Sequence, residues 1–491
     1  MAISIEKQVQ VGLIYVDNPP VNAISESVAS GIIEAIETLE SDPVIRVVVL
    51  TARGRTFVAG ADVRKFEQMI HERICHLGAG LYDVTNRIEQ CKKPVVCAMF
   101  GTTLGGGLEL AMSCHYRIAL KASLLGQPEV KLGLIPGAGG TQRLPRLCGI
   151  VKAAELCAFG DSITAEEAHE FGIVDRLAES DLIAEAIEYA LQISNLGPRR
   201  TCDQVEKLTF GSQEESKLQK IRQLAQEKFQ GATCSGLAID AVAKSAMLSF
   251  EDGLTIENDL FVQAHSSPEA HALISLFFAE RAVAKVVGVS RDTDCRSCDS
   301  VAFLGLNQPY GAILPMLIRN ELDIQLAYQA VPVRPCEIVF VSQWDSVIQN
   351  TVNSMNDPIV VMTSNEFDWE SLEPVDGLVQ NLVGLKMTVN SNFAFAEIAI
   401  HGSTSPTATA TMIQLMKKLK IPFVVEKPNP VFASDRIAKQ RFDSSDLMIE
   451  AWQLVNEKVV ERISDIDVIQ VNCFRVPRHL ANVGISIEAK K

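Results

Sequence analysis

The 491-residue sequence lacks any run of 18 or more consecutive apolar residues, so it predicts no membrane-spanning helix. Its first 20 residues, MAISIEKQVQVGLIYVDNPP, carry charges within a strand-like pattern and lack the apolar centre of a signal peptide. We therefore expect the protein to stay inside the cell. Basic residues are in deficit, with 45 Lys and Arg against 60 Asp and Glu. The resulting net charge of −15 argues against a broad nucleic-acid-binding surface.

Metal-binding patterns are also scarce. The eight histidines include no pair at a metal-ligand spacing, and most of the 12 cysteines stand beside apolar residues, as buried reduced thiols do. The one tight pair is Cys295 and Cys298 in DTDCRSCDS. A zinc site needs four ligands, and no second Cys or His pair lies near in the sequence. We therefore predict no metal site, and we favour a linker with incidental thiols over a zinc or redox site.

The length and the order of strand-like and helix-like segments predict an α/β protein with several domains. A chain of 491 residues is too long for one ordinary core, so we expect two or more domains. Strand and helix patterns alternate to about residue 190, which is typical of an α/β fold. Helix formers dominate from about 200 to 290. The first elements are expected at 9–17 (strand), 26–40 (helix), 44–52 (strand) and 94–101 (strand).

A second α/β pattern follows the polar, turn-rich stretch VGVSRDTDCRSCDS (287–300), which is a candidate domain boundary. The pattern restarts with SVAFLGLNQPYGAILPMLI (300–318), and helices are expected from about residue 437 onward. Further strands are predicted near 337–342, 358–363 and 421–426.

Two isolated acids stand in apolar, glycine-rich stretches. Glu109 follows three glycines in LGGGLELAM (104–112) and begins the helical-looking LELAMSCHYRIAL (108–120), and Glu129 lies in GQPEVKLGLIPGAGG (126–140). A lone Glu in such a turn is usually a solvated or capping residue. However, free N–H groups at a helix N-terminus can stabilise a developing oxyanion. Two carboxylates in partly apolar surroundings can also divide the roles of general acid and general base.

A third glycine-alanine turn is flanked by basic residues. It lies in RTFVAGADVRKF (55–66), next to Arg55, Arg64 and Lys65. Such a cluster is suited to holding phosphate groups.

The order and spacing of three stretches resemble the crotonase (enoyl-CoA hydratase/isomerase) superfamily. They are FVAGADV (57–63), GTTLGGGLELAMSCHYRIA (101–119) and GQPEVKLGLIPGAGGTQRLPRL (126–147). The segments NPPVNAIS (18–25) and CHYRIA narrow the resemblance to the peroxisomal bifunctional (multifunctional type 1) family, in which a hydratase precedes a 3-hydroxyacyl-CoA dehydrogenase. This part of the resemblance covers about residues 1–290 and includes the linker-like FFAERAVAK (277–285).

The resemblance implies a crotonase-type ββα spiral domain at 1–195 and a helical linker at 196–290 that completes the CoA site. It implies that the backbone N–H groups of Ala61 and Gly106 form an oxyanion hole. Glu109 and Glu129 would hold the catalytic water between them, and Gly137 would help to position it. The implied CoA channel is lined by Val21, Ala23, Ala59 and Asp62, with Arg55 and Arg64 near the CoA phosphates.

The second half resembles the dehydrogenase of the bifunctional family but departs from its motifs. In VAFLGLNQPYGAILP, Gly305 stands at the first position of a G-x-G-x-x-G loop, whereas Asn307 and Tyr310 replace the second and third glycines, and Gly311 is one residue out of register. Those two glycines allow backbone approach to the pyrophosphate and close helix packing. We therefore predict that NAD is not bound.

The later dehydrogenase motifs are altered too. Glu366 and Phe367 replace the end of an S-N-T-S segment, and Lys386 stands where the family has its catalytic histidine. Glu397 matches the acidic partner of that histidine, and Asp435 replaces an asparagine. A lysine is not a neutral base at pH 7 unless its pKa is strongly lowered. We expect a degenerate Rossmann-like domain at 298–428 and a truncated, short helical C-terminus at 429–491, both without dehydrogenase activity.

The expected function is hydration of 2-enoyl-CoA thioesters in fatty-acid β-oxidation, with a Δ3,Δ2-isomerase activity through Glu129 as a possible second one. The alternatives are a non-catalytic acyl-CoA-binding or scaffold protein, and another reaction on a crotonase fold, such as hydrolysis or decarboxylation. The substrate would be an acyl-CoA thioester, and no cofactor is required.

The expected assembly is a monomer or a small homo-oligomer, without nucleic acid. The resemblance implies a peroxisomal location, although the C-terminus EAKK lacks an S-K-L type address. A cytoplasmic location is the alternative.

Overall fold

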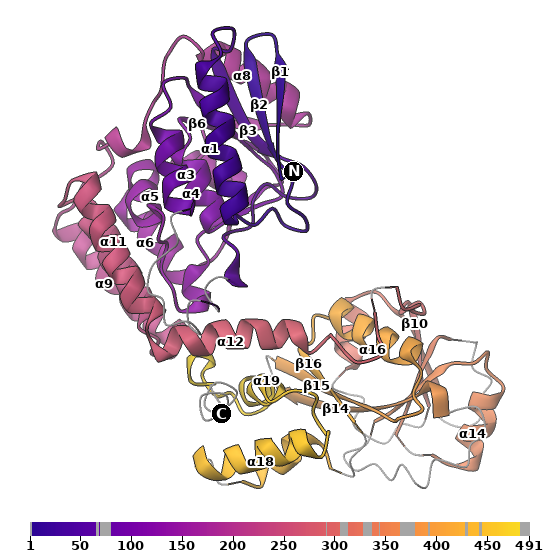
Figure 1. Cartoon of the computed structure of the whole chain (residues 1–491). Coiled ribbons are helices and arrows are strands. Elements are labelled where there is room, and N and C mark those ends of the chain that lie inside the picture. Colours follow the sequence, from indigo (N-terminus) through magenta and orange to yellow (C-terminus); the bar gives the residue numbers. More distant parts are fainter. Residues whose placement is uncertain are drawn as a thin grey trace. The chain divides into compact units, whose positions relative to one another are not determined.

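The structure is a computed structural model of the chain, and it forms two compact units, Met1–Ile274 and Ser275–Lys491 (Figure 1). The boundary lies inside a helix, α12 (Pro268–Ala282), rather than at the polar stretch 287–300. The division into four segments stays a prediction. The structure describes residues 2–64, 68, 80–290, 292–304, 313–327, 336–342, 344–363, 379–390, 393–427, 431–440 and 444–481.

A six-stranded sheet in the order β1-β2-β3-β4-β6-β9 forms the centre of the first unit. β1 and β2 are antiparallel, and each later neighbour pairs in parallel. Every residue of β2, β3 and β4 is buried, as in parallel sheets that are covered on both faces. The strands are β1 (Ile3–Gln8), β2 (Val11–Val16), β3 (Val47–Ala52), β4 (Val95–Met99), β6 (Tyr116–Leu120) and β9 (Arg176–Ala178).

Helices cover this sheet. α8 (Leu182–Ile193) packs on β2, β3, β4 and β6, and α1 (Glu26–Ser41) packs on β1 and β2 and against α3 (Gly80–Glu89). Ser25 caps α1 by accepting a hydrogen bond from the N–H of Val28, and Asp181 caps α8 in the same way through Ala184. These predicted early elements are therefore confirmed, except that a turn at residues 9–10 separates β1 from β2.

A second, three-stranded sheet and a group of helices make up the rest of the first unit. The sheet has the order β5-β7-β8, with β5 (Thr102–Leu104), β7 (Leu124–Gly126) and β8 (Ile163–Thr164). The helices are α4 (Gly106–Ser113), α5 (Gly140–Cys148), α6 (Ile150–Phe159), α7 (Ala165–Phe171), α9 (Ser212–Lys228), α10 (Cys234–Lys244) and α11 (Phe250–His265), with short 3-10 turns η1 (Glu129–Leu132) and η2 (Thr201–Asp203).

One expected element is wrong. The stretch 108–120 is not a single helix, because α4 ends at Ser113 and β6 begins at Tyr116. The reason is tertiary: the ring of the fully buried His115 joins two backbone segments, accepting from the N–H of Val95 at Nδ1 and meeting the carbonyl of Glu89 at Nε2. Burial lowers the pKa of His115 to about 4, which fits a neutral, structural imidazole.

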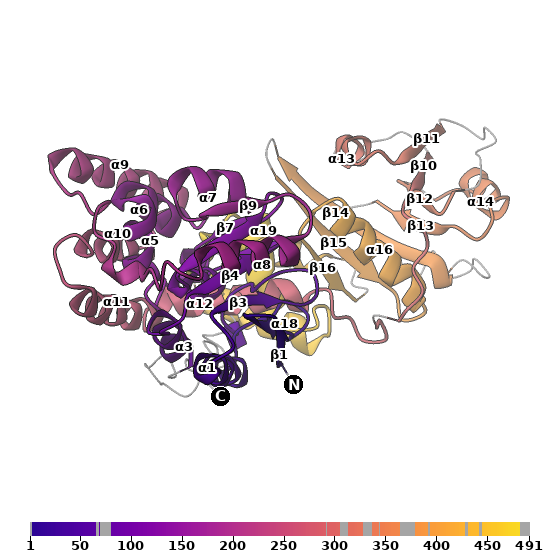
Figure 2. The same ribbon diagram turned by 90° about the horizontal axis from the view of Figure 1, so that it is seen from above.

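A seven-stranded sheet in the order β11-β10-β12-β13-β14-β15-β16 forms the second unit (Figure 2). Its strands are parallel except for the antiparallel pair of β14 and β15. Three predicted strands are confirmed as β12, β13 and β16. The strands are β10 (Ser300–Leu304), β11 (Asp323–Ala327), β12 (Ile338–Val341), β13 (Ile359–Met362), β14 (Leu382–Asn390), β15 (Phe393–Ile400) and β16 (Phe423–Glu426).

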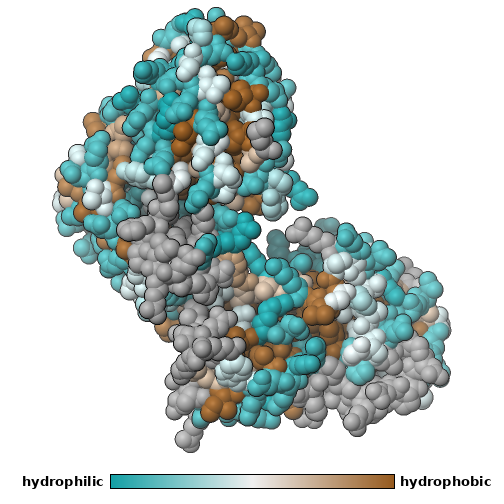
Figure 3. Space-filling model, viewed as in Figure 1, coloured by the Kyte–Doolittle hydropathy of each residue, from teal (hydrophilic) through white to brown (hydrophobic). Residues whose placement is uncertain are grey.

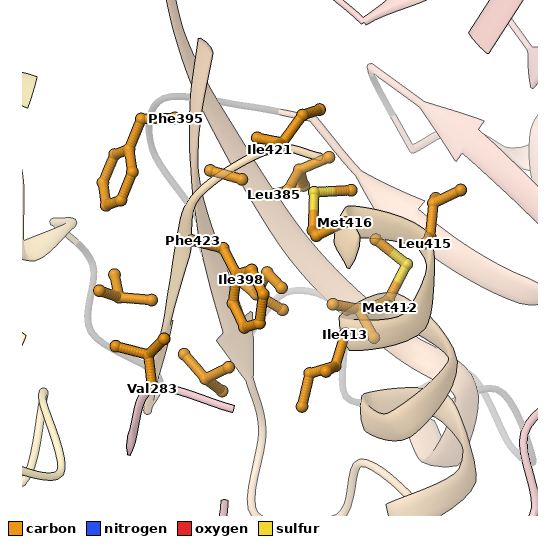
Figure 4. Close-up of a cluster of buried hydrophobic side chains, with 14 of the residues drawn as sticks. Val283, Leu385, Phe395, Ile398, Met412, Ile413, Leu415, Met416, Ile421 and Phe423 are labelled. Carbon is orange, nitrogen blue, oxygen red and sulfur yellow. The ribbon is translucent and has the colours of Figure 1, made fainter. Parts of the chain in front are cut away.

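The helices of this unit are mostly short. α16 packs on β14 and β15, where Met412, Met416, Leu385 and Phe423 belong to one apolar core (Figure 4). The α/β class predicted for both halves is confirmed. The helices are α13 (Leu314–Arg319), α14 (Ser346–Asn353), α16 (Pro406–Lys418), α17 (Ala433–Ala438), α18 (Ser444–Asn456) and α19 (Ser464–Cys473), with the 3-10 turns η4 (Val379–Asn381) and η5 (Arg478–Leu480).

The surface in view is mainly hydrophilic over the first unit, with hydrophobic residues scattered among polar ones (Figure 3). In the described part of the chain, no helix is both long and apolar enough to cross a membrane.

Candidate active site

The carboxylate of Glu109 is fixed by the start of another helix. Glu109 lies in α4, is 2% exposed, and accepts hydrogen bonds at Oε1 from the N–H groups of Ala138 (2.7 Å) and Gly140 (3.0 Å). Gly140 begins α5, so the positive end of that helix faces the carboxylate. A β-carbon on Gly140 would lie 2.7 Å from Oε1, which explains the glycine. Both of these hydrogen bonds go to Oε1, and the N–H of Gly137 also lies close enough to lower the pKa of this carboxyl.

Glu129 lies in the same region of the first unit as Glu109, beside Gly105 and Gln127. It begins η1, three residues after the end of β7, and a β-carbon built on Gly105 would lie only 2.7 Å from its Oε1. When the side-chain amide of Gln127 is oriented with its nitrogen toward Glu129, this nitrogen donates to both carboxylate oxygens, at 3.1 and 3.2 Å. Gln127 also lies beside Gly140, the residue that binds Glu109. The structure therefore brings the two predicted glutamates to the two sides of one site.

The two predicted oxyanion donors are neighbours. A β-carbon built on Gly106 would lie 3.2 Å from the backbone nitrogen of Ala61. Within the described residues, neither N–H donates to a protein acceptor. Gly106 is the first residue of α4, where N–H groups have no acceptor within the helix. The bridge between Ile24 and Ala61 is made by the carbonyl of Gly60 and the N–H of Asp62. Two unpaired, adjacent amides beside Glu129 are suited to an oxygen that gains negative charge.

The electrostatics of the two glutamates differ. Burial raises the pKa of Glu109, but the N–H groups of Ala138, Gly140 and Gly137 and the charge of Arg143 oppose this rise. Burial also raises the pKa of Glu129, and the negative charge of Glu109 raises it further, to well above the usual range. The pKa of Glu129 is therefore raised further than that of Glu109.

A third buried acid, Glu257 of α11, was missed by the sequence analysis. It is 1% exposed, and its carboxylate accepts from the N–H groups of Gly139 (2.6 Å) and Thr141 (2.8 Å) and from Thr141 Oγ1 (2.5 Å). Burial, followed by the charge of Glu109, raises the pKa of Glu257 to about 8. The signal was present in the sequence, since Glu257 falls on the helical stripe of Leu254 and Phe261, which are both buried.

The sequence of the first unit matches a known protein family. The profile of the enoyl-CoA hydratase/isomerase family matches residues 6–240. Residues 6–240 belong to the enoyl-CoA hydratase/isomerase family. We call this region the hydratase/isomerase domain. It contains all of the site residues named above except Glu257.

Sequence similarity to some known proteins extends beyond this domain. A peroxisomal bifunctional enzyme of Cavia porcellus is 40% identical over 309 residues, which are 60% of this chain and 41% of that protein. The human peroxisomal bifunctional enzyme is 38% identical over 322 residues, 64% of this chain and 43% of that protein. The chain thus spans less than half the length of the relatives that it matches. A structure of enoyl-CoA hydratase subunit I from Geobacillus kaustophilus is 30% identical and covers 57% of this chain and 95% of that one, with a TM-score of 0.37.

The residues predicted to line a CoA channel form one strip of the hydratase/isomerase domain. The N–H of Ala59 donates to the carbonyl of Val21 (3.1 Å), and the N–H of Asp62 donates to that of Ile24 (3.4 Å). These bonds align 21–24 with 59–62, so Ala23 and Ala61 share the strip. The role of this strip in CoA binding stays a prediction.

The predicted phosphate-binding arginines are both exposed. Arg64 forms an ion pair with Asp62 at 2.7 Å, and this partner raises the pKa of Arg64. The positive charge of Arg64, which was expected to bind a phosphate group, is therefore paired with Asp62, another residue of the predicted site. Lys65, the third basic residue of this segment, lies outside the described residues.

In the second unit, Lys386, Glu397 and Asp435, three of the positions that the resemblance compares with dehydrogenase motifs, lie together. Lys386 of β14 faces Glu397 of β15, and its Nζ lies 2.5 Å from Asp435 Oδ1 and 2.9 Å from Ser434 Oγ. The ammonium group of Lys386, whose side chain is 12% exposed, therefore has Asp435 and Ser434 as close partners and Glu397 at 3.9 Å. The dinucleotide-loop positions Gly305, Asn307, Tyr310 and Gly311, the altered Glu366 and Phe367, and the tail EAKK lie outside the described residues.

No group of three or more His, Cys, Asp or Glu side chains suited to a metal ion occurs among the residues that the structure describes. Cys295 is exposed and Cys298 is buried, and both are free thiols.

Proposed function

We propose that the hydratase/isomerase domain adds water across the double bond of 2-enoyl-CoA thioesters, as a step of fatty-acid β-oxidation. One observation carries the proposal: Glu109, held by the N–H groups of Ala138 and Gly140, lies near Glu129 and near the N–H groups of Ala61 and Gly106, which have no protein acceptor among the described residues. This arrangement supplies a base, an acid and an oxyanion hole within one small region.

In the proposed reaction, the thioester oxygen accepts hydrogen bonds from the N–H groups of Ala61 and Gly106. A water between the two glutamates loses a proton to Glu109 while its oxygen bonds to the β-carbon. The electron pair of the double bond moves toward the thioester, so negative charge develops on the carbonyl oxygen. Glu129 then gives its proton to the α-carbon, and Gly137 helps to position the water. The assignment follows from the environments, since the amides favour the charged form of Glu109 and burial favours the neutral form of Glu129.

The magnitudes are adequate for catalysis. A single oxyanion-hole donor is typically worth about 2.7–4 kcal/mol of barrier. A positioned general acid or base contributes about 10²–10⁴-fold in rate. Neither contribution requires a cofactor, and the substrate is the CoA thioester itself.

The purified full chain should hydrate crotonyl-CoA, and this is measured by the loss of absorbance of the conjugated thioester. Glu109→Gln and Glu129→Gln should each lower kcat by about 10²–10⁴-fold. Glu170→Gln is the matched control because Glu170 is an exposed acid of the same unit. A wild-type protein that binds CoA thioesters without hydrating, isomerising or cleaving them would instead be the acyl-CoA-binding or scaffold protein.

A second activity, Δ3,Δ2-enoyl-CoA isomerisation, follows from the position of Glu129 beside both amide donors. In its ionised form, the single carboxylate of Glu129 can take a proton from the α-carbon and return it to the γ-carbon while the amides hold the oxyanion. This activity should survive Glu109→Gln better than hydration does, because it uses no water. Equal loss of both activities in that variant would exclude the assignment to Glu129 alone.

The second unit, we propose, does not oxidise 3-hydroxyacyl-CoA and does not bind NAD. The hydroxyl oxidation needs a neutral base, whereas the Lys386 ammonium is held by Asp435 and Ser434. Isothermal titration of the full chain with NAD should show no binding with a sub-micromolar Kd. Incubation of the protein with 3-hydroxyacyl-CoA and NAD should produce no NADH.

The compartment proposed for the protein is the peroxisome, since the relatives reported above are named as peroxisomal enzymes. Imaging of the full chain, with a fluorescent tag at its N-terminus, tests this against the cytoplasmic alternative. The proposed assembly state is a monomer or a small homo-oligomer, which light scattering measures.

A further inference from the structure

Glu109 of α4 and Glu257 of α11 accept hydrogen bonds from alternate backbone N–H groups of the turn at residues 138–141. The N–H groups of Ala138 and Gly140 donate to Glu109, whereas those of Gly139 and Thr141 donate to Glu257. The turn therefore has one acid on each side, and each successive N–H points to the opposite one. We propose that Glu257 is a positioning residue for hydration, which holds this turn so that its other two amides fix Glu109. This inference rests on the proposed function of Glu109.

The turn needs a second partner for a physical reason. Gly139, Gly140 and Thr141 lie at the start of α5, where N–H groups have no acceptor within the helix. Glu109 satisfies Ala138 and Gly140 only. Without Glu257, the N–H groups of Gly139 and Thr141 would be buried without a partner. A buried donor in that state is costly, so the turn would rearrange and carry the two amides away from Glu109 Oε1.

The opposite face of the turn is otherwise closed. Arg143 Nη1 donates to the carbonyl of Ala138 at 2.9 Å, and the fully buried Arg143 guanidinium is itself held by Glu89. A β-carbon on Gly139 would lie 2.0 Å from Arg143 Nη1, and this glycine has a left-handed φ of 88°. The carbonyl side is therefore anchored, and the N–H side depends on the two carboxylates.

Packing of α11 on α5 sets where Glu257 stands. A β-carbon on Gly253 would lie 2.2 Å from Gln142 Oε1, so the two helices meet closely one turn before Glu257. Gln142 Nε2 donates to Thr141 Oγ1 at 3.0 Å, which joins this contact to the Glu257 network. Both oxygens of Glu257 are occupied by the turn. For this reason Glu257 acts through Glu109 and does not itself meet the reacting atoms.

The test compares Glu257→Gln with Asp259→Asn in the full chain. Asp259 is an exposed acid on the same helix. We expect Glu257→Gln to lower kcat for crotonyl-CoA hydration at least tenfold while KM changes less than about twofold, because the predicted CoA strip at 21–24 and 59–62 lies on other elements. Hydrogen–deuterium exchange of the peptide containing Ala138–Thr141 should become at least tenfold faster. Asp259→Asn should change neither quantity.

Thr141→Val serves as a milder variant if Glu257→Gln does not fold. It removes the hydroxyl hydrogen bond but keeps the N–H, so an intermediate loss of kcat is expected. A lower melting temperature with unchanged kcat, KM and exchange would mean a merely structural role and would overturn the proposal. The two proposals can also fail separately. If the wild-type protein does not hydrate crotonyl-CoA, the proposed function is refuted. If amide exchange in the turn is nevertheless faster in Glu257→Gln, the role of Glu257 in fixing the turn is supported.

Discussion

Lys386 and Glu397 lie directly opposite each other in the antiparallel pair of β14 and β15, with Nζ 3.9 Å from Oε2. Glu397 is fully buried and also accepts from the N–H of Ser434 (2.9 Å) and from Ser434 Oγ (2.5 Å). Asp435 is the nearer acid to the lysine, at 2.5 Å, and is 39% exposed. The lysine thus ties the start of α17 to the β14–β15 pair. The position predicted to correspond to a catalytic histidine of the bifunctional family is part of an ion network.

Lys386→Met should destabilise the second unit. Removing the cation leaves the buried Glu397 with only the hydrogen bonds from Ser434, and losing one partner of a buried polar group typically costs about 1–3 kcal/mol. Chemical unfolding followed by tryptophan fluorescence measures the change. Lys417→Met on the exposed face of α16 is the control and should cost less than about 0.5 kcal/mol. Equal stability of the two variants would show that the network contributes nothing.

Gly107→Ala should disturb the first unit at the site. A β-carbon there would lie 2.1 Å from the carbonyl oxygen of Val58, which already accepts from the N–H of Leu104. Because the obstacle is backbone, we expect a loss of about 3 kcal/mol or more together with loss of hydration. The control is Gly211→Ala, whose β-carbon would meet nothing closer than 3.5 Å. Normal melting and activity of Gly107→Ala would contradict the close approach.

The contribution of Glu257 to the stability of the first unit should fall as pH rises from about 4.5 to about 8. Burial raises the folded-state pKa of Glu257 from 4.5 to about 8, so in this window the unfolded chain has released a proton that the folded protein keeps. Stability rises with pH only where the unfolded state binds more protons, so here the slope is negative, up to about 1.4 kcal/mol per pH unit. Urea unfolding at several pH values should give a shallower slope for Glu257→Gln. An identical slope in both proteins would exclude a buried proton on Glu257.

Thiol labelling should separate the two cysteines of the CRSC segment. Cys295 is exposed, whereas Cys298 is 4% exposed, and burial raises its pKa to about 11. At pH 8 in the native protein, alkylation should therefore modify Cys295 and spare Cys298. Mass spectrometry of the peptide reports both sites. Protection of both thiols that is lost on adding a chelator would instead support the zinc alternative.

The sequence by itself determined the local structure and singled out the candidate residues of the site. The all-buried strands β3, β4, β12 and β13 are continuous apolar runs, and such runs stay buried whichever element covers them. Glu109 and Glu129 were identified because a carboxylate among glycines and apolar residues is unusual. The pattern of glycines carries this information, since each position allows a close backbone approach that any side chain would block.

Only the tertiary structure decided what surrounds those glutamates. Glu257 joins the turn at Gly139 from 118 positions further along the chain, through the packing of α11 on α5. His115 ends α4 because two distant backbone segments share its ring. The Lys386–Glu397 pairing depends on the register of β14 and β15. In each case a buried polar group must find its partner inside the protein, and the fold rather than the spacing along the chain determines which partner is in reach.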